Sequence, residues 1–155
     1  MNGKAETEAQ YATDRNLRAR SDLVGRYSKR NWFEWVHQHL KLPSDCSVLD
    51  VGCGMGWFWL SSEAAKTPLE RLALVDSSPA LLEQAEENLS ACDWIGTVEA
   101  VECDAVSLPF DDNSVGTALA MHMLYHVTDQ EAAVRELARV VRPKGKIAVT
   151  TNSLD

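Results

Sequence analysis

Apolar and polar positions follow two different spacings along this chain. After a polar start, residues 17–40 carry apolar side chains at helical intervals: Leu17, Tyr27, Trp32, Trp35, Val36 and Leu40. The sequence Leu-Pro-Ser-Asp at residues 42–45 ends this pattern. We therefore expect a helical amino-terminal segment, residues 1–41, before a main domain of residues 42–155.

From Cys46 onward, apolar runs of strand length alternate with segments of helix length. The predicted strands are residues 46–51, 71–75, 97–103, 115–121 and 146–151, and the predicted helices are residues 57–66, 79–92 and 129–141. Strands that alternate with helices form βαβ units, so we predict an α/β domain with a parallel sheet covered on both faces. Such sheets bind ligands beyond the carboxyl ends of their strands, where the strand order reverses.

Short polar motifs mark the ends of two predicted helices. Ser77 or Ser78 is expected to cap the helix of residues 79–92, with Pro79 in its first turn. The sequence Arg-Pro-Lys-Gly at residues 142–145 is expected to close the last helix before the fifth strand. Both motifs place a loop next to a strand end.

A glycine loop follows the first predicted strand. Gly52, Gly54 and Gly56 alternate with other residues in Asp-Val-Gly-Cys-Gly-Met-Gly, residues 50–56. Glycine lets a backbone turn tightly and approach a ligand without interference from Cβ. A tight turn without a ligand is the alternative, but three glycines in five residues, each with an entropic cost, favour a ligand loop. A dinucleotide site requires GxGxxG, and here the third glycine comes one residue early, which disfavours NAD.

Asp76 closes the second predicted strand, 20 residues after Gly56. A carboxylate there can accept hydrogen bonds from both ribose hydroxyls, each worth about 1.5–3 kcal/mol. The same charge would repel a 2′-phosphate, which disfavours NADP. Asp76 alone would also fit an ordinary helix N-cap. Together with the glycine loop, it is better interpreted as a ribose ligand.

In this order and spacing, the motifs resemble the class I S-adenosylmethionine (SAM)-dependent methyltransferases, especially the small-molecule methyltransferases with an LPF motif. The resemblance covers about residues 42–151 and rests on four motifs: residues 48–56, residues 74–80, Cys103-Asp104-Ala105 with Leu108-Pro109-Phe110, and residues 139–145. It implies a Rossmann-like doubly wound sheet with parallel strands in the order 3-2-1-4-5. It also implies SAM as cofactor and S-adenosylhomocysteine as product.

The resemblance assigns the methionine end of the cofactor to the first and fourth strands. Gly52 and Gly54 would lie against the methionine part of SAM. Asp50 would orient the loop and help to hold the amino group of the ligand, with or without a bridging water. Met121, at the end of strand four, would offer backbone contacts to the same moiety.

The adenosine end is assigned to the second and third strands. Asp76 would bind the ribose, Asp104 would accept a hydrogen bond from the adenine amino group, and the Ala105 amide would face a ring nitrogen. Two positions depart from the family pattern. Ser77 stands where an apolar residue usually contacts adenine, and Gly116 stands where an acid often precedes strand four.

Residues 121–126, Met-His-Met-Leu-Tyr-His, face the acceptor region in the family. His122 or His126 could serve as general base for a hydroxyl acceptor; the alternative is that both are loop or cap residues. No further side chain has metal-ligand spacing with them, so no metal is expected. Because an amino-terminal helix often crosses the cofactor in this family, residues 1–41 are expected to cover the site. Tyr27 and Arg20 could then reach the SAM carboxylate, the alternatives being helix packing and solvent.

Composition and charge exclude several other classes. The chain has 155 residues, 45% of them hydrophobic and 25% charged, as expected for one soluble domain. A net charge of −8 disfavours nucleic acid as partner, and the basic stretch of residues 15–30 is interpreted as a solvated helix face. Neither a membrane span nor a secretory signal is recognisable, so a cytoplasmic protein is expected. Four scattered cysteines are interpreted as structural: Cys46, Cys53, Cys92 and Cys103.

The family fold has two further strands after the fifth, and this chain stops just after strand five. We therefore expect a sheet that lacks strands 6 and 7, with residues 147–151 as an exposed edge that favours a homodimer. Three functions remain open. They are SN2 transfer of the sulfonium methyl to a small-molecule acceptor, SAM binding or interaction without catalysis, and nucleotide-dependent oxidoreduction, which the glycine spacing disfavours.

Overall fold

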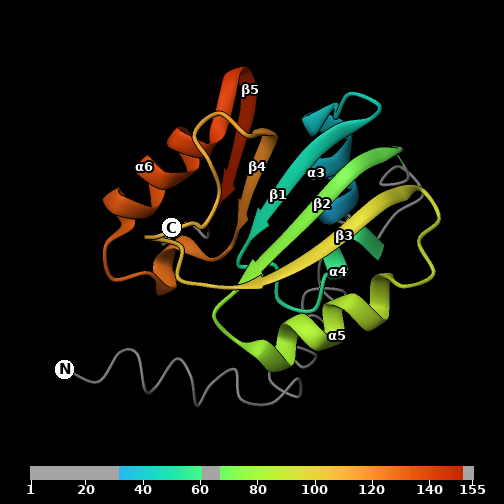
Figure 1. Ribbon diagram of the computed structural model, residues 1–155, viewed down its shortest axis with the longest axis horizontal. Helices are drawn as coiled ribbons and strands as arrows, with labels where there is room; N and C mark the ends of the chain where they lie inside the picture. Colours follow the sequence, from blue (N-terminus) through green and yellow to red (C-terminus); the bar gives the residue numbers. More distant parts are fainter. Residues whose placement is uncertain (1–31, 61–66, 152–155) are drawn as a thin grey trace.

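The computed structural model describes residues 32–60 and 67–151 and contains one parallel sheet (Figure 1). The elements in chain order are α3 (Trp32–Leu40), β1 (Cys46–Val51), α4 (Trp57–Leu60), β2 (Leu69–Asp76), α5 (Pro79–Leu89), β3 (Ile95–Glu102), β4 (Val115–Met121), the 3-10 turn η2 (Leu124–His126), α6 (Gln130–Val140) and β5 (Val141–Thr150). The sheet has the order β3-β2-β1-β4-β5, so the predicted fold and strand order are confirmed. The order reverses between β1 and β4, which makes their carboxyl ends the expected ligand edge.

The core lies on both faces of this sheet. In β2, Leu72 and Leu74 belong to one buried cluster, and Ala73 and Val75 belong to another. Buried side chains of α3, α4 and α5 complete the first cluster, and those of α6 complete the second, so that α6 lies apart from the other helices (Figure 1). Burial on both faces explains why the strands are almost continuously apolar.

Several predicted boundaries match the structure, and others shift by a few residues. The strands β1 and β4 begin and end as predicted. The strands β2 and β3 each begin two residues earlier than expected, because Leu69 pairs with Ile95 before the longer apolar runs start. The helix α5 ends at Leu89, before the predicted end at Cys92. The parts of the predicted helices that precede Trp32 or follow Leu60 lie outside the described residues.

The prediction for strand five was wrong at its start. Val141 already pairs with Val115, and pairing resumes with Thr117 opposite Lys146. Residues 142–145 therefore form an irregularity within β5, where Lys144 adopts a φ of 67°. The Arg-Pro-Lys-Gly sequence ends α6 as expected, but it does so inside a paired strand. Gly116, where an acid was expected, lies within β4 opposite this irregularity, and its amide donates to the Ser47 hydroxyl at 3.0 Å.

Helix ends are held in different ways. Ser78 occupies the N-cap of α5 with Pro79 in the first turn, but its hydroxyl makes no capping hydrogen bond. In α6, the Asp129 carboxylate accepts from the Ala132 amide at 2.9 Å, which is a regular N-cap. At the end of α3, the Lys146 ammonium donates to the carbonyl oxygens of Leu40 and Lys41, at 2.8 and 2.7 Å.

Three further findings concern membrane-spanning helices, the cysteines and the outer strand. None of the helices within residues 32–60 and 67–151 is long and apolar enough to cross a membrane. All four cysteines carry free thiols, and Cys46 is buried. On the outer strand β5, Ile147 and Val149 are each 44% exposed. Among the described residues, β5 is an outer strand of the sheet.

Candidate functional site

The glycine loop and Asp76 meet at the carboxyl edge of the sheet. After β1 ends, the amides of Gly52 and Cys53 both donate to the Val75 carbonyl oxygen of β2, at 2.7 and 3.1 Å. The Gly54 amide then donates to Oδ2 of Asp76 at 3.0 Å. The loop that follows β1 and the acid that closes β2 are thus joined directly, at neighbouring strand ends.

The first two glycines of the loop have different surroundings. Both adopt positive φ values, 71° for Gly52 and 55° for Gly54. A Cβ on Gly52 would meet Cβ of Met123 at 2.5 Å, so this glycine is required by protein packing. A Cβ on Gly54 would meet no atom within 4 Å. Gly54 is therefore the position at which the backbone is open to an approaching ligand.

The Asp76 carboxylate is held by two backbone amides. Oδ2 accepts from Gly54 and Oδ1 accepts from Ser78, each at 3.0 Å. Burial raises the pKa of Asp76, and these amide bonds oppose that rise. Because each carboxylate oxygen can accept a second hydrogen bond, the group can also receive two ligand hydroxyls. Ser77 follows as an exposed residue.

Asp50 lies beneath the loop and is only 2% exposed. Its Oδ2 accepts a hydrogen bond from Nε1 of Trp59 at 2.9 Å. Burial, opposed by this bond, raises the pKa of Asp50 to about 7. The sequence prediction missed Trp59, since a tryptophan in an apolar helix gives no sign that its ring nitrogen binds an acid.

We predict that Asp50→Asn reduces the dependence of stability on pH. The unfolded chain loses the Asp50 proton near pH 4 and the folded chain near pH 7. The contribution of Asp50 to the free energy of unfolding therefore falls as pH rises between these values, by up to about 4 kcal/mol. Urea denaturation at pH 4.5, 6 and 8 should show a flatter profile for the variant, with Asp93→Asn as exposed control. Parallel profiles for Asp50→Asn and wild type would contradict this.

Asp104 and Ala105 follow β3 at the same edge of the sheet. The Cys103 amide donates to the Asp76 carbonyl oxygen at 3.3 Å, which keeps the end of β3 beside the end of β2. Asp104 is exposed, and its Oδ1 accepts from the Val106 amide at 3.2 Å. Ala105 is buried. The structure thus brings Asp104 next to the strand end that carries Asp76.

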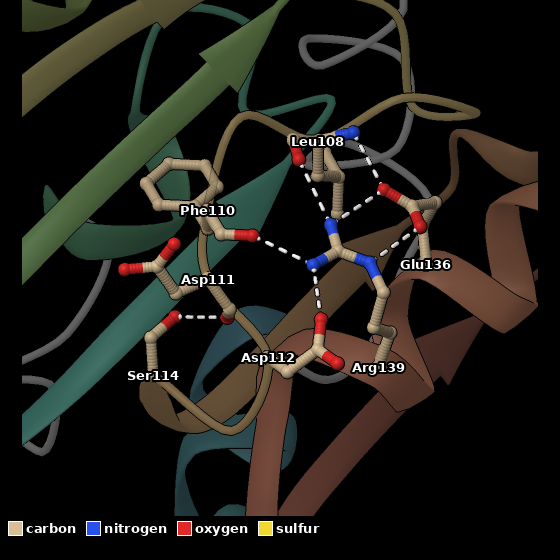
Figure 2. Close-up of polar contacts among 7 residues, drawn as sticks. All are labelled: Leu108, Phe110, Asp111, Asp112, Ser114, Glu136 and Arg139. Carbon is tan, nitrogen blue, oxygen red and sulfur yellow. Dashed lines mark hydrogen bonds and ion pairs between the residues drawn. The ribbon is translucent and has the colours of Figure 1, made fainter.

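An arginine on α6 holds the segment that follows Asp104, residues 108–110, here called the LPF segment. Arg139 donates to the carbonyl oxygens of Leu108 and Phe110, at 2.9 and 2.7 Å, and to both oxygens of Glu136 (Figure 2). The Leu108 amide donates to Oε2 of Glu136 at 2.8 Å. In the sequence, Glu136 and Arg139 have the spacing of an ordinary surface ion pair, so their role was not predicted.

The end of β4 carries the histidines expected on the acceptor side. Met121 closes the strand, and the His122 amide donates to the Thr150 carbonyl oxygen of β5 at 3.0 Å. His122 has a φ of 55°, and its ring centroid lies 5.8 Å from that of Trp32 on α3. The His126 amide donates to the Met123 carbonyl oxygen at 2.9 Å. Both histidines follow the switch-point strand, whereas Tyr27 and Arg20 lie outside the described residues.

The described residues fit a nucleoside with an amino-acid tail. The open position at Gly54, the carboxylate of Asp76 and the exposed carboxylate of Asp104 follow three adjacent strands of one edge. Adenine, ribose and an amino-acid moiety require polar partners at separate places, and these strand ends carry polar groups at separate places. In residues 32–60 and 67–151, no three His, Cys, Asp or Glu side chains lie together in a metal-binding group.

Comparisons with known proteins agree with this geometry. The sequence family described as "Methyltransferase domain" matches residues 49–149. The ubiquinone/menaquinone biosynthesis C-methyltransferase UbiE of Hahella chejuensis is 29% identical and aligns with 83% of this chain and 52% of its own length. The demethylmenaquinone methyltransferase of Desulfitobacterium hafniense is 32% identical, over 76% of this chain and 47% of its own length.

A solved structure has the same fold. The crystal structure of the cyclase SpnF superposes with a TM-score of 0.66 at 28% identity, over 77% of this chain and 43% of its own. The chain spans about half the length of the curated relatives that it matches. Since the family match covers residues 49–149, the chain belongs to the methyltransferase domain family, and S-adenosylmethionine is its expected cofactor.

Proposed function

We propose that the protein binds SAM at the carboxyl edge of β2, β1 and β4 and transfers its methyl group to a small-molecule acceptor. The observation that carries this proposal is the direct bond between the Gly54 amide and the Asp76 carboxylate, next to an open backbone position. This bond joins a turn whose backbone a ligand can approach closely to a carboxylate that can accept hydrogen bonds from ligand hydroxyls. The two groups lie at adjacent strand ends. When bound, SAM supplies a methyl group activated by its sulfonium charge, which a nucleophile displaces in line.

Each group at the edge has a proposed part in binding. Gly54 and Gly52 form the wall of the methionine end, with backbone contacts from Met121. Asp76 accepts from the ribose hydroxyls, beside Ser77. At the methionine end, the Asp50 carboxyl, whose pKa is about 7, orients the loop and favours a nearby ammonium group.

At the adenine end, Asp104 accepts from the adenine amino group and Ala105 donates its amide to the ring. Before the described residues, Tyr27 and Arg20 are proposed to reach the SAM carboxylate from the amino-terminal segment of residues 1–41.

Calorimetric titration tests the cofactor assignment. We expect S-adenosylhomocysteine to bind and NAD not to bind at matched concentrations. At 100 times its dissociation constant, the ligand should add about 2.7 kcal/mol to the free energy of unfolding, measured by denaturation. Binding of NAD alone would replace this proposal with an oxidoreductase.

His122 or His126 is proposed as general base when the acceptor is a hydroxyl group. Both follow β4, and the positive φ of His122 is a strained conformation of the kind found at functional sites. A general base is inactive when protonated, so transfer of labelled methyl groups to an acceptor panel should lose its decrease toward low pH in His122→Asn or in His126→Asn. The panel includes demethylmenaquinone, because one relative is named for that acceptor. An unchanged pH profile in both variants would leave the histidines as loop residues.

SAM binding without methyl transfer is the second candidate. It is favoured by the likeness to SpnF, which is named a cyclase, since one fold carries several functions. Tight binding of S-adenosylhomocysteine with no methyl transfer to any member of the panel would support it.

We also propose a homodimer through the edge of β5, where Ile147 and Val149 are exposed. Light scattering at high concentration should detect it, and a monomer there would exclude it.

A further inference from the structure

Two residues of α6, Glu136 and Arg139, hold the LPF segment through hydrogen bonds to its backbone. Arg139 uses all five of its N–H groups: Nε and Nη2 donate to Glu136, Nη2 also to Leu108, and Nη1 to Phe110 and Asp112 (Figure 2). The donor distances run from 2.7 to 2.9 Å. A planar guanidinium can satisfy several acceptors at fixed angles, which an ammonium group cannot. Arg139 thus fixes the path of the backbone through the two carbonyl oxygens and also pairs with two carboxylates.

Glu136 completes the arrangement from the same helix. Its Oε2 accepts from the Leu108 amide at 2.8 Å, so Leu108 is bound at both its N–H and its carbonyl oxygen. The Arg139 guanidinium lowers the pKa of Glu136 to about 2, and the Glu136 carboxylate raises the pKa of Arg139. The pair therefore stays ionised throughout the neutral range.

The side chains of the LPF segment are also held. Leu108 is 4% exposed and belongs to the buried cluster under α6. The guanidinium of Arg71 on β2 lies over the Phe110 ring, 5.8 Å from its centre, and Arg71 is itself paired with Glu99 of β3. The segment is thus attached to α6 through its backbone and to the sheet through its side chains.

Asp104 lies between this attachment and the end of β3. On one side, the Cys103 amide is bound to the Asp76 carbonyl oxygen at 3.3 Å. On the other, only three residues separate Asp104 from Leu108, and the turn between them is closed by the Ser107 amide donating to the Asp104 carbonyl oxygen at 3.0 Å. With both ends held, the turn presents Asp104 and Ala105 in one arrangement.

We infer that Glu136 and Arg139 are positioning residues for the adenine end of the cofactor site. By holding the LPF segment, they fix the turn that carries Asp104 and Ala105, and so provide the recognition of adenine. The inference rests on the proposed function, in which that turn contacts the adenine ring. Neither residue touches the cofactor, and both act through the turn.

The test compares two ligands that differ only at the base. One is S-adenosylhomocysteine, and the other is its inosine analogue, in which an oxygen replaces the adenine amino group and the ring nitrogen carries a proton. Calorimetry with the wild-type chain should show at least about tenfold tighter binding of the adenine ligand, as expected for one charged hydrogen bond. In Arg139→Met, this ratio should fall to about threefold or less.

Matched variants separate positioning from general damage. Arg135→Met makes the same change on the same helix, where Arg135 and its partner Glu131 are both 76% exposed, and should keep the wild-type ratio. Arg139→Lys keeps the charge but cannot bond both carbonyl oxygens and Glu136 together, so its ratio should also fall. A merely destabilised variant would bind both ligands less tightly and leave the ratio unchanged.

Three outcomes bear on the inference and on the proposed function. A folded Arg139→Met chain that keeps the wild-type ratio would overturn the inference while leaving the proposed function in place. If Arg139→Met does not fold, Glu136→Gln gives the same decision, because the loss of the ionised partner should also lower the ratio. A wild-type chain that binds neither ligand would overturn the proposed function, and this inference with it.

Discussion

Asp76→Ala should weaken the binding of S-adenosylhomocysteine by about tenfold or more. The substitution removes the acceptor that the ribose hydroxyls are proposed to use, and it also frees the Gly54 and Ser78 amides that the carboxylate now binds. Calorimetry measures the affinity directly. Because the loop loses a support, a decrease in stability should accompany the loss of binding.

Two comparisons isolate the ribose contact from this structural effect. Glu102→Ala removes an exposed carboxylate from the end of β3, opposite Asp76 in the sheet, and should leave the affinity unchanged. The 2′,3′-dideoxy analogue of the ligand lacks the hydroxyls and should bind wild type and Asp76→Ala almost equally. If Asp76→Ala binds the normal ligand as tightly as wild type does, Asp76 has no part in ribose recognition.

Alanine at Gly52 should mainly lower stability, whereas alanine at Gly54 should mainly weaken ligand binding. At Gly52 the new Cβ would collide with Met123 at 2.5 Å, in addition to the strain of a positive φ. We expect this variant to lose roughly 2–5 kcal/mol of stability. At Gly54 the new Cβ meets no protein atom within 4 Å, so only the backbone cost of about 1–2 kcal/mol applies.

The loss of ligand binding should be the main effect of the substitution at Gly54. In Gly54→Ala the methyl group occupies the open side of the loop and should weaken S-adenosylhomocysteine binding by on the order of tenfold or more, although the chain remains folded. Urea denaturation and calorimetry of both variants provide the two measurements. Gly54→Ala with wild-type affinity would mean that the ligand does not approach this backbone position.

The fold could be predicted because its signals are local. The strands β1 and β4 are buried on both faces and bounded by glycine or polar loops, so their limits appear in the sequence itself. The start of β5 could not be predicted in this way. A Pro-Lys-Gly sequence normally ends an element, and only the pairing of Val141 with Val115 across the sheet makes it part of a strand.

The candidate site was predictable to the extent that it is built from strand ends. The positions of Gly54, Asp76 and Asp104 follow from the parallel sheet and from short loops after each strand. The contacts of Trp59 and Arg139 do not, because they join residues of different elements through side-chain nitrogens. A buried indole and a helical ion pair have the same sequence pattern whether or not they support a ligand loop.

The ammonium group of Lys146 connects two parts of the chain that are more than a hundred residues apart. Lys146 lies on the outer strand of the sheet, and its ammonium group donates hydrogen bonds to the carbonyl oxygens of Leu40 and Lys41, where α3 ends. The outer strand of the sheet and the end of the helix before β1 are therefore joined through a single cation.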